Sequence, residues 1–146
     1  MVSRKFAVSS LVHYIIRIHS SLCTRRGWLD YSDPDVEWSK RPEIDRWILS
    51  LLNSLVKDVD GYLEAYEPTR AGRAISDFVN DNLSNWYVRL NRRRFWGGGM
   101  TEDKLSAYQT LYTCLETVAK LMAPIAPFYA DQLFLDLVAV TGRENV

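Results

Sequence analysis

Apolar side chains recur at intervals of three and four residues over most of this chain, and that spacing permits few folds. The pattern begins at Ile44 and continues, with interruptions at Pro68 and at a run of glycines, as far as Val138. Because an α-helix completes a turn in about 3.6 residues, such spacing collects apolar side chains on one face. No stretch shows the two-residue alternation of a half-buried β-strand. The sequence therefore predicts an all-α fold, an antiparallel helix bundle of three strong helices and a shorter fourth.

Proline, glycine and threonine mark the expected helix ends. Proline is favoured in the first turn of a helix, glycine just beyond the last turn, and a threonine side chain caps the first backbone amides. Residues 27–41 are polar and turn-rich, which is typical of a connector, and residues 141–146 are expected to fray. The four helices of the domain at 42–140 are predicted from Pro42 to about Tyr66, from Pro68 to Gly97, from Thr101 to Met122, and from about Pro127 onward.

The same spacing predicts which side chains face the core. On the first helix the predicted core side chains include Trp47 with Ile48. On the second helix they include Leu83, Trp86 with Tyr87, and Leu90. Cys114 lies one position away from the apolar face of the third helix and is expected to be an unreactive thiol. With Cys23 it forms neither a disulfide framework nor a metal site, which favours a reducing, cytoplasmic location.

Charge limits the kinds of partner. The chain has 146 residues, as many basic as acidic side chains, and no apolar run long enough to span a membrane. Binding to nucleic acid would therefore depend on a local basic patch. Such a patch occurs between Asn82 and Trp96, where four arginines, at positions 89, 92, 93 and 94, fall within six residues.

The composition of this patch suits RNA. Guanidinium groups pair with phosphate oxygens, and tryptophan or arginine side chains stack on unpaired bases. The alternative is that the arginines solvate a helix end and complement its dipole. Charge alone leaves both open, and for the ring of Trp86 the periodicity favours the core over an RNA-facing surface.

Three motifs resemble one known family. Residues 82–96, which read Asn-Leu-Ser-Asn-Trp-Tyr-Val-Arg-Leu-Asn-Arg-Arg-Arg-Phe-Trp, resemble the anticodon-binding domain of isoleucyl-tRNA synthetase, a class I aminoacyl-tRNA synthetase. The runs Arg41–Ile48 and Met122–Phe128 resemble the same family in the same order. The resemblance covers roughly residues 30–137. The sequence of residues 89–96 resembles the isoleucine enzyme more than its valine and leucine relatives.

The resemblance implies a function for the basic patch. In the family, a helical bundle grips the anticodon arm of the tRNA, here the isoleucine acceptor, while a separate nucleotide-binding domain performs the aminoacylation. The RNA-binding residues implied for this chain are Asn85, Trp86, Arg89, Arg92, Arg93, Arg94 and Trp96.

No catalytic constellation accompanies these motifs. The family's two ATP-site signatures are absent, so ATP and Mg²⁺ would belong to a catalytic domain outside this chain, which should be inactive alone. The glycine run at 97–99 follows no strand and precedes no Lys-Ser pair, so it predicts a helix exit rather than a phosphate loop. A helical protein-interaction module without RNA binding is the main alternative, and a complete small enzyme is a weaker one. Salt-dependent binding to tRNA would distinguish an RNA-binding domain from a protein-interaction module.

Residues 1–26 do not resemble the family. This segment holds five basic residues and no acidic one, which is typical of a transit peptide. Another hypothesis fits better. Ile18–Thr24 and the start of Arg25 can be encoded by a string that, read two bases later, gives Ser-Phe-Phe-Ala-Leu-Tyr-Ala, which resembles the family's first bundle helix. An off-frame segment of this kind would leave an apolar groove through which the chain self-associates.

Overall fold

The computed structural model describes residues 35–96 and 101–141, apart from the side chains of residues 96 and 139–141. The hypotheses for residues 1–26 and for the glycine run fall outside this part of the chain. Every element within it is helical: the 3₁₀ turn η1 (Trp38–Lys40), α2 (Glu43–Glu64), α3 (Pro68–Asp77), the π-helical segment η2 (Phe78–Val88), α4 (Arg92–Trp96), α5 (Glu102–Met122) and α6 (Pro127–Thr141). This arrangement confirms the predicted all-α class.

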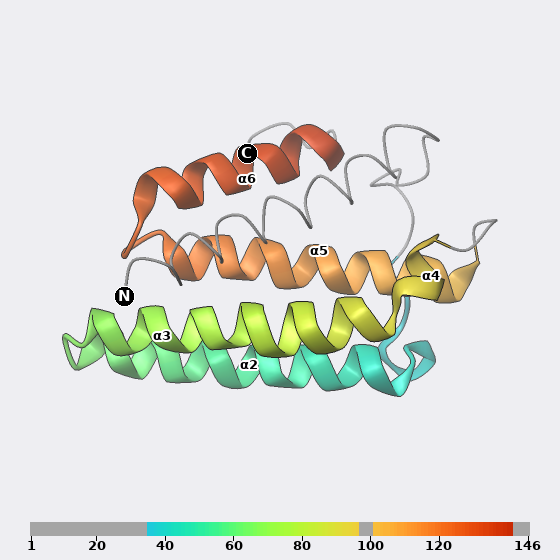
Figure 1. Cartoon of the computed structure of the whole chain (residues 1–146), viewed down its shortest axis with the longest axis horizontal. Coiled ribbons are helices and arrows are strands. Elements are labelled where there is room, and N and C mark those ends of the chain that lie inside the picture. Colours follow the sequence, from blue (N-terminus) through green and yellow to red (C-terminus); the bar gives the residue numbers. More distant parts are fainter. Residues whose placement is uncertain (1–34, 97–100, 142–146) are drawn as a thin grey trace.

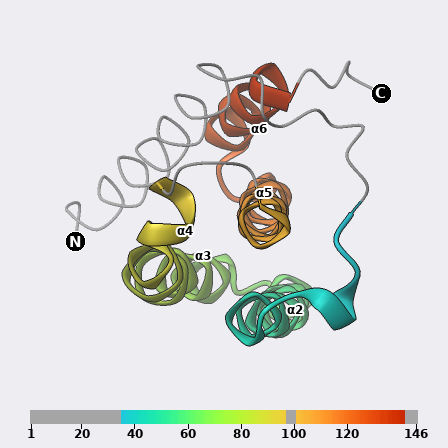
Figure 2. The same ribbon diagram turned by 90° about the vertical axis from the view of Figure 1, so that its right-hand side faces the viewer.

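Successive long helices run in opposite directions, as the short connections predict. In Figure 1, α2 lies beside the continuous path of α3 and η2, and α5 lies above them, with α6 on its far side. The end-on view in Figure 2 shows α5 between the lower pair and α6. Because the chain turns back each time, the first turns of α2 and α5 meet α4 at one end of the bundle.

The core forms where these helices face one another. The central helix α5 contributes the most buried side chains, which include Leu111, Leu115 and Val118. From α2, Ile48, Leu52, Leu55 and Val59 are buried at the three- and four-residue spacing predicted from the sequence. Burial of such apolar side chains is the main favourable contribution to folding, about 1.5–3 kcal/mol for each one fully buried.

Two helix starts follow the local rules. Pro42 precedes α2, with Glu43 and Asp45 in its first turn. The prediction that Thr101 caps the third helix is confirmed, because its hydroxyl oxygen accepts a hydrogen bond from the Lys104 amide at 3.2 Å. Within the described residues, no helix is long and apolar enough to cross a membrane.

The π-helical segment η2 changes which side chains reach the core. Its hydrogen bonds connect residues five apart, so its turn is wider than that of an α-helix. In an α-helix, residues four apart overshoot a full turn by about 40°, and the wider turns of η2 counteract that drift. The result is an unbroken buried line at every fourth position: Ile75, Val79, Leu83, Tyr87 and Asn91.

This register overturns two predictions of burial. Trp86 is 58% exposed and Leu90 is 59% exposed, whereas Tyr87 is fully buried. The sequence-based assignment of Trp86 to the core was therefore wrong, because it assumed α-helical spacing throughout. On α2, Trp47 is also exposed, at 38%, since the buried line of that helix passes through its neighbour Ile48.

Candidate nucleic-acid interface

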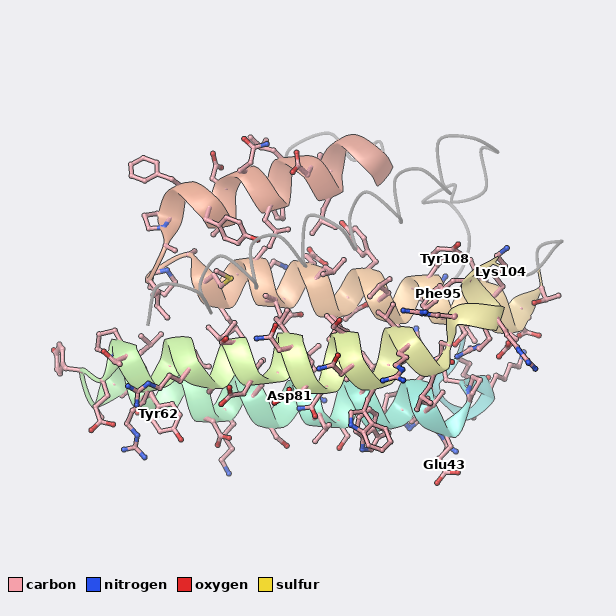
Figure 3. The ribbon with its side chains drawn as sticks, in the orientation of Figure 1. Glu43, Tyr62, Asp81, Phe95, Lys104 and Tyr108 are labelled. Carbon is pink, nitrogen blue, oxygen red and sulfur yellow. The ribbon has the colours of Figure 1, made fainter. Side chains whose placement is uncertain are left out.

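Three segments distant in sequence converge at one end of the bundle. They are the first turn of α2, the short helix α4 with the end of η2, and the first turns of α5. Figure 3 shows Phe95 of α4 close to Tyr108 and Lys104 of α5, toward the same end as Glu43 and far from Tyr62. The arginine-rich residues 89–94 therefore occupy an end that several helices build together.

Arg94 is committed to contacts within the protein. A guanidinium group has five N–H donors, and all five are used. Nη1 donates to Asp45 Oδ1 at 2.8 Å and to Asn91 Oδ1 at 2.9 Å. Nη2 donates to Asp45 Oδ2 at 2.9 Å and to the Asp103 carbonyl oxygen at 2.8 Å, while Nε donates to Asp103 Oδ2 at 2.9 Å. No donor of Arg94 remains for a phosphate in this arrangement.

Asp45 is the buried counter-ion of Arg94. Its carboxylate has no exposed surface, and besides Arg94 it accepts hydrogen bonds from Tyr87 Oη at 2.8 Å and from Ser106 Oγ at 2.7 Å. Burial by itself would raise the pKa of Asp45, but the hydrogen bonds from Arg94, Ser106 and Tyr87 outweigh it. The pKa therefore lies below its ordinary value of 3.8, and the group is ionised at neutral pH.

The same contacts act on the neighbouring titratable groups. Burial, and then the charge of Asp45, raises the pKa of the Tyr87 hydroxyl, so it stays a neutral donor. Burial lowers the pKa of Arg94, but the hydrogen bonds to Asp45 and Asp103 reverse this effect and raise it above its ordinary value. Asp45 and Arg94 thus form a charged ion pair. Both carboxylate oxygens and all three guanidinium nitrogens also have hydrogen-bond partners outside the pair.

Aromatic packing completes the attachment of α4. The ring of Phe95 is buried and meets the ring of Tyr108 edge-on, with 5.3 Å between centroids. Tyr108 Oη also donates a hydrogen bond to the Phe95 carbonyl oxygen at 3.1 Å. Asn91, at the junction with η2, donates from Nδ2 to the Tyr87 carbonyl oxygen at 2.8 Å. The helix is therefore attached to the bundle by Phe95, Asn91 and Arg94 together.

The other three arginines are arranged differently from Arg94. Arg89, Arg92 and Arg93, here called the arginine cluster, have exposed side chains. Among the residues that the structure describes, none forms a hydrogen bond or ion pair with these three side chains. Asn85 and Trp86 are exposed on the preceding η2 segment, and the side chain of Trp96 lies outside the described part. Of the seven RNA-binding candidates, Arg94 is therefore the one whose side-chain donors are seen to be paired within the described part of the protein.

Sequence reasoning missed the role of Asp45. Its place in the first turn of a helix marks it only as an acidic residue near the positive end of the helix dipole. A stronger signal was present, because Asp45 lies at the start of the buried line that continues through Ile48, Leu52, Leu55 and Val59. A carboxylate in register with a core face needs a buried partner, and that requirement pointed to a cation elsewhere in the chain.

Cys114 is expected to be unreactive in the folded protein. Its side chain is fully buried, and burial raises the pKa of the thiol to about 12, so the reactive thiolate is both scarce and inaccessible at neutral pH. In a Cys23→Ser variant, a chromogenic disulfide reagent should modify no thiol under native conditions and one thiol per chain in denaturant. Native modification at the rate of an exposed cysteine would contradict this placement.

Groups of three or more His, Cys, Asp or Glu that could hold a metal ion do not occur among the described residues. The exposed side chains at this end include arginines, the amide of Asn85 and the indole of Trp86, groups that bind anions and stack on flat rings.

Comparison with known proteins identifies a matching family. Residues 45–144 match the family described as the anticodon-binding domain of tRNA ligase. The chain is 76% identical over 117 residues to an isoleucine--tRNA ligase of Bacteroides fragilis, which is 80% of this chain and 10% of that protein. It is 70% identical over 113 residues to that of Porphyromonas gingivalis and 51% identical over 106 residues to that of Thermobifida fusca, covering 77% and 73% of this chain. The chain thus spans about a tenth of the length of the curated relatives it matches.

Proposed function

Because this chain belongs to the family of tRNA-ligase anticodon-binding domains, we propose that it binds the anticodon arm of a tRNA through the arginine cluster. The observation that carries the proposal is the contrast between the arginines at this end of the bundle. Arg94 has every donor paired internally, whereas Arg89, Arg92 and Arg93 are exposed and have no partner among the described residues. Exposed guanidinium groups beside an exposed tryptophan suit phosphates and unpaired bases.

We further propose that the tRNA is the isoleucine acceptor. The relatives are named isoleucine--tRNA ligases, and the identity to the Bacteroides fragilis protein extends over most of this chain. In this proposal the cluster supplies phosphate contacts, while Asn85 and Trp86 lie where a base could be contacted. Aminoacylation, with ATP and Mg²⁺, is assigned to parts of a longer ligase, and the chain acts with its tRNA in the cytoplasm. Self-association through an apolar groove stays a prediction.

The experiment is a titration of the isoleucine-acceptor tRNA with the chain at several salt concentrations. Each phosphate contact contributes about 0.9 to the slope of log affinity against log salt. The double variant Arg92→Ala with Arg93→Ala should therefore lower the slope by about two, and lower the affinity about a hundredfold at 50 mM salt. Circular dichroism verifies that both proteins are folded.

A matched control separates local contacts from net charge. Arg70→Ala with Arg73→Ala removes the same charge from exposed positions in α3, near the other end of the bundle. This control should leave the slope unchanged. Equal slopes for the two double variants would remove the cluster from the interface. Binding that does not depend on salt would favour the alternative of a helical protein-interaction module.

A further inference from the structure

We propose that Asp45 is a positioning residue for RNA binding, which through Arg94 fixes α4 and so directs Arg92 and Arg93 toward the RNA backbone. The inference rests on the proposed function, since it assigns to a buried carboxylate the orientation of two arginines in the proposed interface. Asp45 itself has no exposed surface, so in this conformation it can act on a bound RNA only through other residues.

The first step is that α4 needs external support. It has 5 residues, Arg92–Trp96, and an isolated helix of that length is unstable in water because nucleation outweighs the few hydrogen bonds formed. Its backbone is joined to η2 through Asn91, whose carbonyl oxygen accepts from the amides of Arg94 and Phe95 at 2.9 Å and 3.2 Å. Side chains that reach other helices are therefore expected to contribute to its orientation as well.

The second step is that Asp45 joins α2 to η2, α4 and α5. Oδ1 accepts from Tyr87 of η2 and from Arg94 of α4, and Oδ2 accepts from Arg94 and from Ser106 of α5. The two carboxylate oxygens hold the guanidinium fork in two places, which fixes its plane as well as its position. A single carboxylate on α2 thus sets the direction of a side chain in the middle of α4.

The third step connects this bridge to the arginine cluster. Arg92 and Arg93 directly precede Arg94 in the same short helix, so a fixed Arg94 restricts the directions in which their exposed side chains leave the bundle. Pre-positioned cations bind without the loss of freedom that mobile ones undergo on binding. The bridge therefore favours binding although it makes no contact with the ligand.

The test measures tRNA binding by the full chain carrying Asp45→Asn and, separately, Arg94→Lys. Asparagine has the shape of aspartate without the charge, and lysine has the charge of arginine without the fork. We expect either variant to weaken binding of the isoleucine-acceptor tRNA about tenfold at low salt and to lower the salt slope by at least one, because the contacts of Arg92 and Arg93 become less persistent. Leu133→Ala, in α6, is the control for lost stability, since this side chain is fully buried away from α4. A smaller folded fraction reduces affinity equally at every salt concentration and leaves the slope unchanged.

A second readout does not depend on RNA. Trypsin cleaves after arginine, so the rate of cleavage after Arg92 and Arg93, followed by mass spectrometry, reports how firmly α4 is held. Cleavage there should accelerate at least tenfold in Asp45→Asn and Arg94→Lys relative to Leu133→Ala. Equal rates in all three variants would overturn the positioning step.

The remaining outcomes are equally decisive. An unchanged salt slope in both folded variants would overturn the role of Asp45 in binding. A slope that rises in Asp45→Asn would also overturn it, because Arg94 would then have been released to contact a phosphate. If the unaltered chain shows no salt-dependent tRNA binding, the proposed function fails, while the cleavage rates still decide whether Asp45 holds α4.

Discussion

Replacing Asp45 by alanine is expected to lower the free energy of unfolding by about 3–5 kcal/mol, the usual cost of removing one partner from a buried ion pair. The carboxylate is fully buried and accepts four hydrogen bonds, so its loss removes one acceptor from Tyr87 and from Ser106 and two hydrogen bonds from Arg94. Asp103 still pairs with Arg94 near the surface, which places the expected loss toward the lower end of that range. The melting temperature of Asp45→Ala should fall by about ten degrees. The control is Asp60→Ala, at an exposed position of the same helix, which should change the free energy of unfolding by less than about 0.5 kcal/mol.

The effect of Asp45 should also depend on pH in a defined direction. Its pKa in the folded protein lies below the ordinary value of 3.8, so the folded state releases this proton more readily than the unfolded state. The resulting stabilisation is complete above about pH 5 and is lost as the pH falls below 3.8 through the lowered pKa of the folded state. Denaturant unfolding at pH 7 and at pH 3 should therefore show a smaller difference between the unaltered chain and Asp45→Ala at the lower pH. A constant difference would mean that the charge of Asp45 does not contribute.

Leu83→Ala and Leu90→Ala should differ sharply, although both replace a leucine on the second long helical path. Leu83 is fully buried in η2, so its truncation should cost about 2–5 kcal/mol, the range for leucine replaced by alanine in a core. Leu90 is 59% exposed, and its truncation should change stability by less than about 0.5 kcal/mol. An uninterrupted α-helix would place both leucines on the buried face, so the pair of variants tests the π-helical register directly.

The measurement is denaturant unfolding of each variant, followed by circular dichroism. Tyr87→Phe adds a finer comparison, because it retains the buried ring and removes only the hydroxyl that donates to Asp45. Its expected cost, about 1.5–3 kcal/mol, is that of a hydrogen bond to a charged group. Similar losses for Leu83→Ala and Leu90→Ala would show that residues 78–88 follow α-helical spacing in solution.

The sequence alone marked residues 82–96 as the candidate site, but it could not show which of their arginines are paired within the protein. Four closely spaced arginines and the family motifs identified residues 82–96 without any structure. Nothing in that run distinguishes Arg94 from Arg92 or Arg93. The distinction arises because the bundle brings Asp45, 49 positions earlier in the chain, within 2.8 Å of Arg94. Sequence spacing describes neighbours on one helix, and it carries little information about which side chains of different helices meet.

The sequence by itself determined the helical class, most helix ends and the apolar faces of α2 and α5, because these depend on local backbone preferences and on a repeat close to that of an α-helix. Tertiary structure decided the register of η2, where the wider turn buries Tyr87 and exposes Trp86 and Leu90. Tertiary structure also decided that, of the four arginines between positions 89 and 94, Arg94 stabilises the fold while the other three remain exposed. In both cases the physical reason is the same: burial and ion pairing are settled between helices, by contacts that no single helix contains.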